Sequence, residues 1–189
     1  MTGKQLPPRL EPYRAMIENT RRPVEVEPTA PGEESVWDYP RPPILEPAPA
    51  MVRVEHGDVI VAQSARALEM KETAGAPVPY IPPEDVRSDW LVANGKTSHC
   101  EWKGIAHAYD LVLPSGERIA DAAFAYLDPH DDLEEGYGAI AGWFGFYPNK
   151  VACFVGNELA RPQPGGFYAG WVTDRIKGPV KGEPGSQGW

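Results

Sequence analysis

The chain has 189 residues, a formal net charge of −9, 22 prolines and two cysteines. This length suits one domain with a substantial core, and an acidic chain without a cluster of Lys or Arg lacks the basic face that nucleic acid requires. The sequence has no run of 18 apolar residues and no apolar leader in its first 30 residues, so we expect a cytoplasmic protein with no membrane partner.

Residues 1–35 predict a proline-rich and largely irregular N-terminal extension. Eleven of the 22 prolines lie within the first 50 residues, and proline interrupts helices and central strands because it lacks an N–H donor. The run YRAMIENT, which starts at Tyr13, is compatible with one short helix. From residue 36 to residue 189 we expect a single domain. Its first segment, VWDYPRPP, contains Trp37 and Tyr39 and should pack on that domain.

Three hairpins are predicted along the domain, because β-branched and alternating runs flank turn residues. They are VRVEHGDVIVA from Val52, the run from Ile105 through the turn PSGE to Leu127, and KVACFVGNELARP from Lys150. Short helical segments are expected at Ser64–Met70, at Pro83–Val86 and within 130–142. The sequence therefore predicts a mainly antiparallel β fold, either a folded sheet or a small barrel, with a Gly/Pro-rich C-terminal arm over residues 162–189.

Seven segments in order resemble the family called domain of unknown function 427. They are VWDYPRPP, RVEHGDVIVAQSARAL, KETAGAPVPYIPPEDV, HCEWKG, ADAAFAYLDP, GWFGFYP and the C-terminal run from PQPGGFYAGW to the final tryptophan. The resemblance covers about residues 36–189. It implies a compact β fold similar to the tent-like folds of methionine sulfoxide reductase B and the cereblon ligand-binding domain. The family also carries a nucleotidyltransferase-like label, which no motif of this sequence supports independently.

Many members of those tent-like folds bind zinc through two CxxC pairs. Cys100 and Cys153 stand alone in this sequence, which excludes a tetrathiolate zinc site. No HExxH spacing is present either, so we expect no metal, and the sequence identifies no cofactor.

The stretch HCEWKG, from His99 to Gly104, is the central candidate for a site. If it is a strand, period two places His99, Glu101 and Lys103 on one face and Cys100 and Trp102 on the other. The resemblance places Cys100 and Lys103 at the core of the motif, with Lys103 as an anion-binding or acid–base group. The alternative is that Cys100 fills the core and that Lys103 pairs with a carboxylate.

The candidate catalytic residues are Lys103, Glu72, Asp85 and Cys100. Glu72, Asp85 and Tyr80 are the acidic and phenolic groups expected to meet Lys103 across adjacent strands, where a carboxylate beside a cation orients a substrate or acts as a base. Equally, Asp85 caps a turn and Glu72 forms a structural ion pair. The ligand-binding candidates are His99, Tyr80, Trp102, Tyr109, Tyr126 and Tyr147, although aromatic residues of this kind also form cores.

These features leave three functions open. The first is a β domain that binds a small molecule in an aromatic pocket, with an anionic or carbonyl group near Lys103. The second is an enzyme that uses Lys103 with Glu72 or Asp85 and Cys100. The third is a structural protein that forms a homodimer through its terminal arms.

Overall fold

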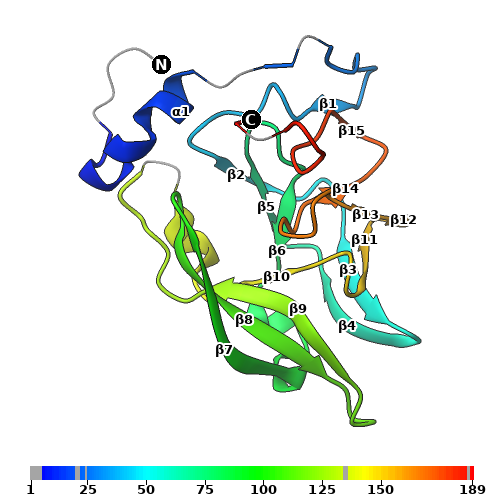
Figure 1. The fold of residues 1–189 in the computed structure, drawn as a ribbon. Coiled ribbons are helices and arrows are strands. Elements are labelled where there is room, and N and C mark those ends of the chain that lie inside the picture. The colour runs from blue at the N-terminus through cyan, green and yellow to red at the C-terminus, as the bar shows by residue number, and fades with distance from the viewer. Residues whose placement is uncertain (1–5, 20–21, 24, 134–135, 187) are drawn as a thin grey trace.

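The computed structural model describes residues 6–19, 22–23, 25–133, 136–186 and 188–189. Short β-strands account for most of its regular structure, as expected from the sequence, and Figure 1 shows them as several sheets below a helical N-terminal segment. The strands are β1 (Glu34–Ser35), β2 (Ile44–Pro47), β3 (Val52–His56), β4 (Val59–Ser64), β5 (Leu68–Lys71), β6 (Val78–Tyr80), β7 (Leu91–Cys100), β8 (Gly104–Val112), β9 (Arg118–Tyr126), β10 (Phe144–Phe146), β11 (Ala152–Val155), β12 (Glu158–Leu159), β13 (Arg161–Pro162), β14 (Trp171–Val172) and β15 (Ile176–Lys177). The helical segments are η1 (Pro8–Tyr13), α1 (Arg14–Glu18), η2 (Pro83–Asp85), η3 (Ser88–Trp90) and η4 (Tyr137–Ile140), all 3₁₀ except α1.

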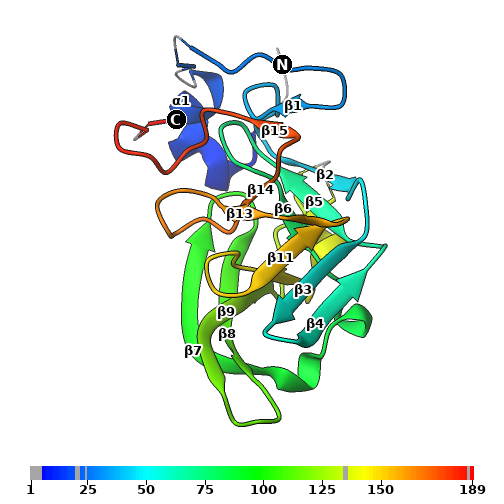
Figure 2. The same ribbon diagram turned by 90° about the vertical axis from the view of Figure 1, so that its right-hand side faces the viewer.

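Three antiparallel sheets form the body of the fold. Their strand orders are β10-β9-β8-β7, β12-β11-β3-β4 and β2-β5-β6. Two short strand pairs lie outside these sheets. β13 pairs with β14 in antiparallel orientation, and β1 pairs with β15 in parallel orientation. Figure 2 shows β3, β4 and β11 beside the long strands β7, β8 and β9. No sheet among the described residues closes on itself, so the folded sheet is confirmed and the barrel is not.

All three predicted hairpins are confirmed. β3 pairs with β4, β8 with β9, and β11 with β12, each in antiparallel register. In β3 the side chains of Val52 and Val54 are buried and alternate with more exposed Arg53 and Glu55. This alternation is the pattern of a strand with one face on a core.

The helix predicted at Ser64–Met70 is wrong, because most of this stretch is extended. β5 is the middle strand of its sheet and is hydrogen-bonded to β2 on one edge and to β6 on the other. Pairing on both edges and burial of Met70 outweigh the weak helix preference of SARALEM. The turn predicted at Pro83–Val86 is confirmed as η2. The helix predicted within 130–142 is reduced to the single turn η4, and residues 134 and 135 lie outside the described residues.

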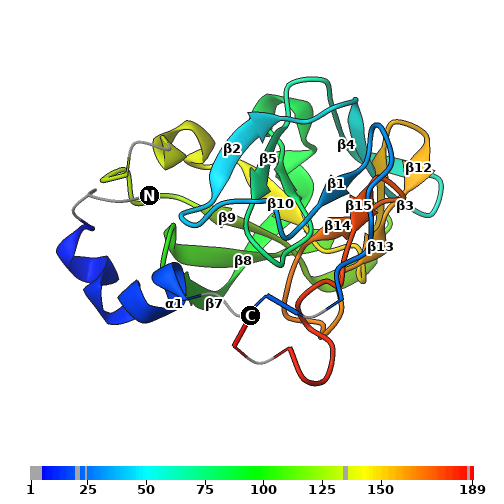
Figure 3. The ribbon, with the colours of Figure 1, turned by 90° about the horizontal axis from the view of Figure 1, so that it is seen from above.

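Two of the buried clusters are important for the site. One lies between the sheet of β3, β4 and β11 and the sheet of β7 to β10, and it includes the free thiol of Cys153. The other contains Leu10, Tyr80, Trp102 and Tyr137, so η1 packs into the same cluster as the β7–β8 turn. Seen from above, the N-terminal helical segment lies beside β7 and β8 (Figure 3).

The segment after residue 35 also packs as predicted. Val36 is fully buried and Trp37 is 6% exposed. The indole N–H of Trp37 donates to the carbonyl oxygen of Pro179 at 2.9 Å, and its ring contacts Trp189 with centroids 5.2 Å apart. This contact connects the N-terminal and C-terminal parts of the chain. None of the described helices is both long and apolar enough to cross a bilayer.

Candidate functional site

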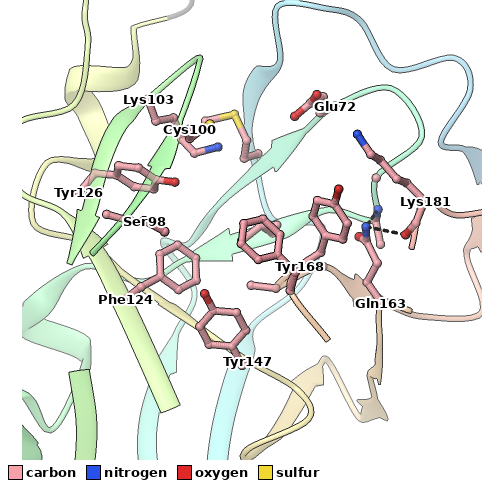
Figure 4. Close-up of a pocket in the computed structure, with 18 of the residues that line it drawn as sticks. Glu72, Ser98, Cys100, Lys103, Phe124, Tyr126, Tyr147, Gln163, Tyr168 and Lys181 are labelled. Atoms are coloured by element: carbon pink, nitrogen blue, oxygen red, sulfur yellow. Dashed lines mark hydrogen bonds between the residues drawn. The ribbon is translucent and has the colours of Figure 1, made fainter. Parts of the chain in front are cut away.

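A cavity of about 240 Å³ lies where four parts of the fold meet. Its walls are the β7–β8 hairpin, β9, the loop between β5 and β6, and the C-terminal segment from Gln163 to Lys181. Figure 4 shows Lys103, Cys100 and Tyr126 on one side of this cavity and Tyr168, Gln163 and Lys181 on the other. Residues that are up to 111 positions apart therefore meet at one site, from Met70 to Lys181.

The stretch HCEWKG is a hairpin turn and not a continuous strand, so the predicted division into two faces is wrong. β7 ends at Cys100, β8 begins at Gly104, and these two residues are paired across the hairpin. Gly104 has a φ of +92°, and a Cβ there would lie 3.2 Å from the His130 imidazole, so the turn depends on glycine. Because the chain reverses here, Cys100 and Lys103 line the cavity together.

One packing contact and two hydrogen bonds hold the β7–β8 turn in place. Trp102 is fully buried in the cluster that includes Leu10. The backbone N–H of His130 donates to the carbonyl oxygen of Lys103 at 3.1 Å, and the Arg9 guanidinium donates to the carbonyl oxygen of Glu101. Backbone contacts of this kind fix where the Lys103 side chain starts and so preorganise the site.

Lys103 is a nearly buried cation. The residue is 8% exposed, and no carboxylate of the described residues lies within salt-bridge distance of its ammonium group. Burial opposes the charged form, but the electrostatic influence of Cys100 and Tyr80 leaves the pKa of Lys103 well above its usual value. The ammonium also lies 5.4 Å from the centroid of the Tyr126 ring, within the range of a cation–π interaction. Lys103 therefore carries a positive charge into the cavity at neutral pH.

Aromatic rings form one wall beside this charge. The Phe124 ring centroid lies 5.9 Å from that of Tyr80, 6.1 Å from that of Tyr126 and 5.2 Å from that of Tyr147. Burial raises the pKa of Tyr80 to about 12, and it also raises the pKa values of Tyr126 and Tyr147. These phenols are neutral at pH 7 and act as hydrogen-bonding groups on an apolar wall.

Glu72 forms the structural ion pair that was one of its two interpretations, whereas its predicted role beside Lys103 stays a prediction. It lines the cavity, and its Oε1 lies 3.2 Å from Nε of Arg41, whose side chain is 3% exposed. Arg41 also donates from Nη2 to the carbonyl oxygen of Thr73 at 3.1 Å. The Glu72 carboxylate is thus held in place by a buried cation behind the cavity wall.

The family whose sequence pattern matches this chain is the domain of unknown function DUF427, over residues 44–157. That match covers more than half of the 189 residues. The chain belongs to the DUF427 family. A search of the curated proteins returns no match. The DUF427 region includes the β7–β8 turn and the aromatic wall, whereas Gln163, Tyr168 and Lys181 lie beyond it.

The structure brings seven of the ten predicted site residues to the cavity. They are Glu72, Tyr80, His99, Cys100, Lys103, Tyr126 and Tyr147. The other three lie elsewhere in the DUF427 region. Tyr109 packs against Phe144 at 5.3 Å in the other core, and fully buried Trp102 anchors the turn from behind. Its indole N–H has no hydrogen-bond partner among the described residues.

Asp85 does not line the cavity, because its carboxylate is bound by side chains from the end of β4 and from the loop before β5. Its carboxylate accepts from Ser64 Oγ at 2.6 Å and from Nη2 of Arg66 at 2.9 Å. Arg66 and Ser64 both lower the pKa of Asp85. These partners lie outside η2, and η2 has no side-chain cap, so the turn-capping alternative is wrong as well.

Gln163 and Lys181 line the cavity from beyond the DUF427 region, and no sequence motif pointed to either of them. Gln163 is 4% exposed; its Oε1 accepts from the backbone N–H of Ala76 at 2.9 Å, and its Nε2 donates to the carbonyl oxygen of Lys181 at 3.0 Å. Through these bonds Gln163 joins the β5–β6 loop to the C-terminal segment and places Lys181 at the cavity. The described residues contain no group of three or more His, Cys, Asp or Glu side chains placed to bind a metal.

Proposed function

We propose that this protein binds a small molecule whose anionic or carbonyl group lies against Lys103. The observation that carries the proposal is the ammonium of Lys103, 8% exposed, in a cavity where no described carboxylate pairs with it. A buried charge is stabilised by a partner of opposite charge or by strong hydrogen bonds. A ligand oxygen in the cavity supplies such a partner.

The surroundings support a ligand pocket in preference to a purely structural lysine. Small-molecule sites are concave and mainly apolar, with a few convergent polar groups. Here the polar groups come from separate elements: Lys103 from the β7–β8 turn, Tyr147 from the segment after β10, and Lys181 from the C-terminal segment. A lysine with a purely structural role in the core would not require polar groups from several separate elements around it.

The test compares Lys103→Met with Lys150→Met, because Lys150 is exposed and does not line the cavity. Methionine keeps the length of the side chain and removes the charge, so the fold should persist. A thermal-shift screen with carboxylates, phosphates and neutral analogues, together with native mass spectrometry of the purified protein, measures binding. We expect anionic compounds to raise the Tm of the wild type and of Lys150→Met but not of Lys103→Met. Equal shifts in all three proteins would refute the proposal.

An enzyme is the second candidate, because Cys100, Lys103 and Glu72 share the cavity. Cysteine attacks as its thiolate, and in an enzyme of this kind Lys103 would supply the positive group beside it. Alkylation by iodoacetamide tests this idea, with the fully buried thiol of Cys153 as an internal control. For an enzyme of this kind we expect Cys100 to react faster than Cys153 and to slow in Lys103→Met. An unchanged rate in Lys103→Met would argue against a catalytic thiol.

The cytoplasmic location, the single domain over residues 36–189 and the homodimer through the terminal arms stay predictions of the sequence. Sedimentation of the purified protein measures the oligomeric state. A monomer at micromolar concentration would exclude the scaffold alternative in its homodimeric form.

A further inference from the structure

We propose that the ligand is an aromatic molecule with a single acidic group, bound with the acid at Lys103 and the ring against the aromatic wall. This inference rests on the proposed function and makes it more specific. It is carried by three properties of the cavity: the arrangement of its rings, the balance of its charges and its size.

The rings are arranged to receive another ring. Phe124 lies at the centre of the wall, with Tyr80 and Tyr126 in edge-to-face contact at interplanar angles of 85° and 90°, and Tyr147 tilted at 53°. Figure 4 shows Tyr126 and Tyr168 on opposite sides of the cavity, with Phe124 and Tyr147 below. Edge-to-face and offset contacts are the favoured geometries between aromatic rings, so a planar ligand ring finds matching partners on several sides.

The charges around the cavity leave room for one negative charge. The residues that line the cavity carry two positive groups, those of Lys103 and Lys181, and two negative groups, those of Glu72 and Glu101. Arg41 already pairs with Glu72 from behind the wall, so the two lysines outnumber the remaining carboxylate, that of Glu101, by one. Lys103 is the buried member of this set that lacks a described carboxylate partner, and it lies beside the ring of Tyr126. One ligand carboxylate or a similar acid balances it.

Lys181 does not require a second acid. Its ammonium lies 5.6 Å from the centroid of the Tyr168 ring, and the residue is only partly buried. Its backbone is fixed by Gln163 and by a bond from its N–H to the carbonyl oxygen of Ala74 at 2.7 Å. Solvent and the neighbouring ring therefore stabilise this cation, whereas Lys103 has little access to solvent.

The cavity is large enough for a small aromatic acid. Its volume of about 240 Å³ accommodates one six-membered ring with a carboxylate.

Four probe compounds distinguish the contribution of the ligand's aromatic ring from the contribution of its negative charge. Benzoate has both features, cyclohexanecarboxylate has the charge without the aromatic ring, benzyl alcohol has the ring without the charge, and isophthalate adds a second acid. NMR titration at neutral pH measures Kd values up to the millimolar range. The full-length wild type, Lys103→Met, Phe124→Leu and Lys150→Met are compared, with thermal melting to confirm that each variant is folded.

In the wild type and in Lys150→Met we expect benzoate to bind roughly three- to tenfold more tightly than cyclohexanecarboxylate. We expect it to bind at least about tenfold more tightly than benzyl alcohol. Lys103→Met should abolish the advantage of benzoate over benzyl alcohol. Phe124→Leu should abolish its advantage over cyclohexanecarboxylate. Isophthalate should gain no affinity over benzoate.

Each opposite result overturns a stated part of the inference. If cyclohexanecarboxylate matches benzoate in the wild type, the aromatic ligand is refuted while the anion site at Lys103 stands. If isophthalate binds about tenfold more tightly than benzoate, the single acid is refuted. If benzoate binds Lys103→Met as tightly as the wild type, both this inference and the proposed function fail. Because the first two results come from the wild type alone, they do not depend on Phe124→Leu being folded.

Discussion

The Lys103 ammonium lies 5.4 Å from the centroid of the Tyr126 ring, although Lys103 belongs to the β7–β8 turn and Tyr126 ends β9. The ring is 6% exposed and the lysine 8%, so water screens this contact weakly. Cation–π interactions are strongest where both partners are desolvated. This contact helps to hold a charge inside the protein without a carboxylate.

The first prediction measures that contact. Tyr126→Leu should lower the free energy of unfolding by about 2–4 kcal/mol, because it removes a buried ring, and Tyr126→Phe should cost less because the ring stays. A double-mutant cycle of Tyr126→Leu with Lys103→Met, followed by urea unfolding, should give a coupling of about 0.5–2 kcal/mol. A coupling of zero would mean that the two side chains are close without stabilising each other.

The second prediction concerns pH. The pKa of Lys103 in the folded protein lies well above its usual value, so the lysine keeps its proton at every pH below its unfolded value of about 10.4. The stabilisation gained from this shift is complete below that pH and is lost only as the pH rises through the folded value. Binding of benzoate should therefore stay constant between pH 6 and pH 9. A fall in affinity within this range would show that a different group holds the anion.

Arg9 provides the third prediction, because it connects the N-terminal segment to the turn. Its guanidinium donates to the carbonyl oxygen of Glu101, and its Nε lies 2.9 Å from the Asp132 carboxylate. Arg9→Met should lower the free energy of unfolding by about 1–2 kcal/mol and weaken binding of the anionic probe. The matched control is Arg14→Met, since the described partners of Arg14 are exposed Glu11 and Glu18 of its own segment.

The control should leave both the stability and the affinity unchanged. Arg9→Lys restores one charged donor but not the forked contact, so it should recover part of the loss. If Arg9→Met and Arg14→Met behave alike, the N-terminal segment does not position the site.

Gly145 on β10 provides the fourth prediction. It is paired with Phe124 across the sheet, and a Cβ at this position would lie 2.4 Å from Cζ of the Phe124 ring. Gly145→Ala must displace that ring, which lines the cavity, and this should cost about 1–3 kcal/mol of unfolding free energy and weaken benzoate binding. Gly75→Ala is the control for stability within the cavity wall, because its Cβ would meet an ordinary contact at 3.5 Å. Thermal melting and NMR titration measure both effects.

The fifth prediction tests the polar cluster that holds the far end of the same sheet. Asp110 accepts from the backbone N–H of Asp121 at 2.9 Å and from the side chains of Asn94 and Arg118, and these bonds lower its pKa to about 2. The stabilisation from the lowered pKa is present above about pH 4 and is lost as the pH falls toward 2. Asp110→Asn should remove about 1–2 kcal/mol at pH 7 and flatten this acid dependence.

Asp174→Asn is the comparison for that experiment, because the Asp174 side chain is 80% exposed and pairs with Arg161 at the surface. Chemical unfolding at pH 7 and at pH 3 should show little change for it. A steep loss of stability between pH 4 and 2 in Asp110→Asn would assign the acid sensitivity to another carboxylate.

The local patterns of the sequence predicted the hairpins well, because alternation and turn residues act between neighbours in the chain. The two places where the fold was misjudged depend on distant partners. β5 is extended because β2 and β6 flank it, and HCEWKG reverses direction because Gly104 adopts a positive φ beside His130. Neither partner can be inferred from the segment itself.

The same reason explains what was predicted of the site. Lys103 and Cys100 were identified through the stretch HCEWKG, and Tyr126 and Tyr147 because aromatic residues often line ligand pockets. Gln163 and Lys181 were missed because their position depends on a C-terminal segment that folds back over the β5–β6 loop. Asp85 was included because of its charge, whereas its role is set by Ser64 and Arg66.

The parallel pairing of β1 with β15 joins residue 34 to residue 176. Contacts between such distant segments form late, because a long loop must close before they contribute. Gln163, Tyr168 and Lys181 belong to the segment that runs to and beyond this pair. During synthesis the DUF427 region emerges before the C-terminal segment, so the cavity acquires its second wall only after the chain up to Lys181 has emerged. Occupancy of the site by a ligand would thus report that the C-terminal segment has folded back onto the DUF427 region.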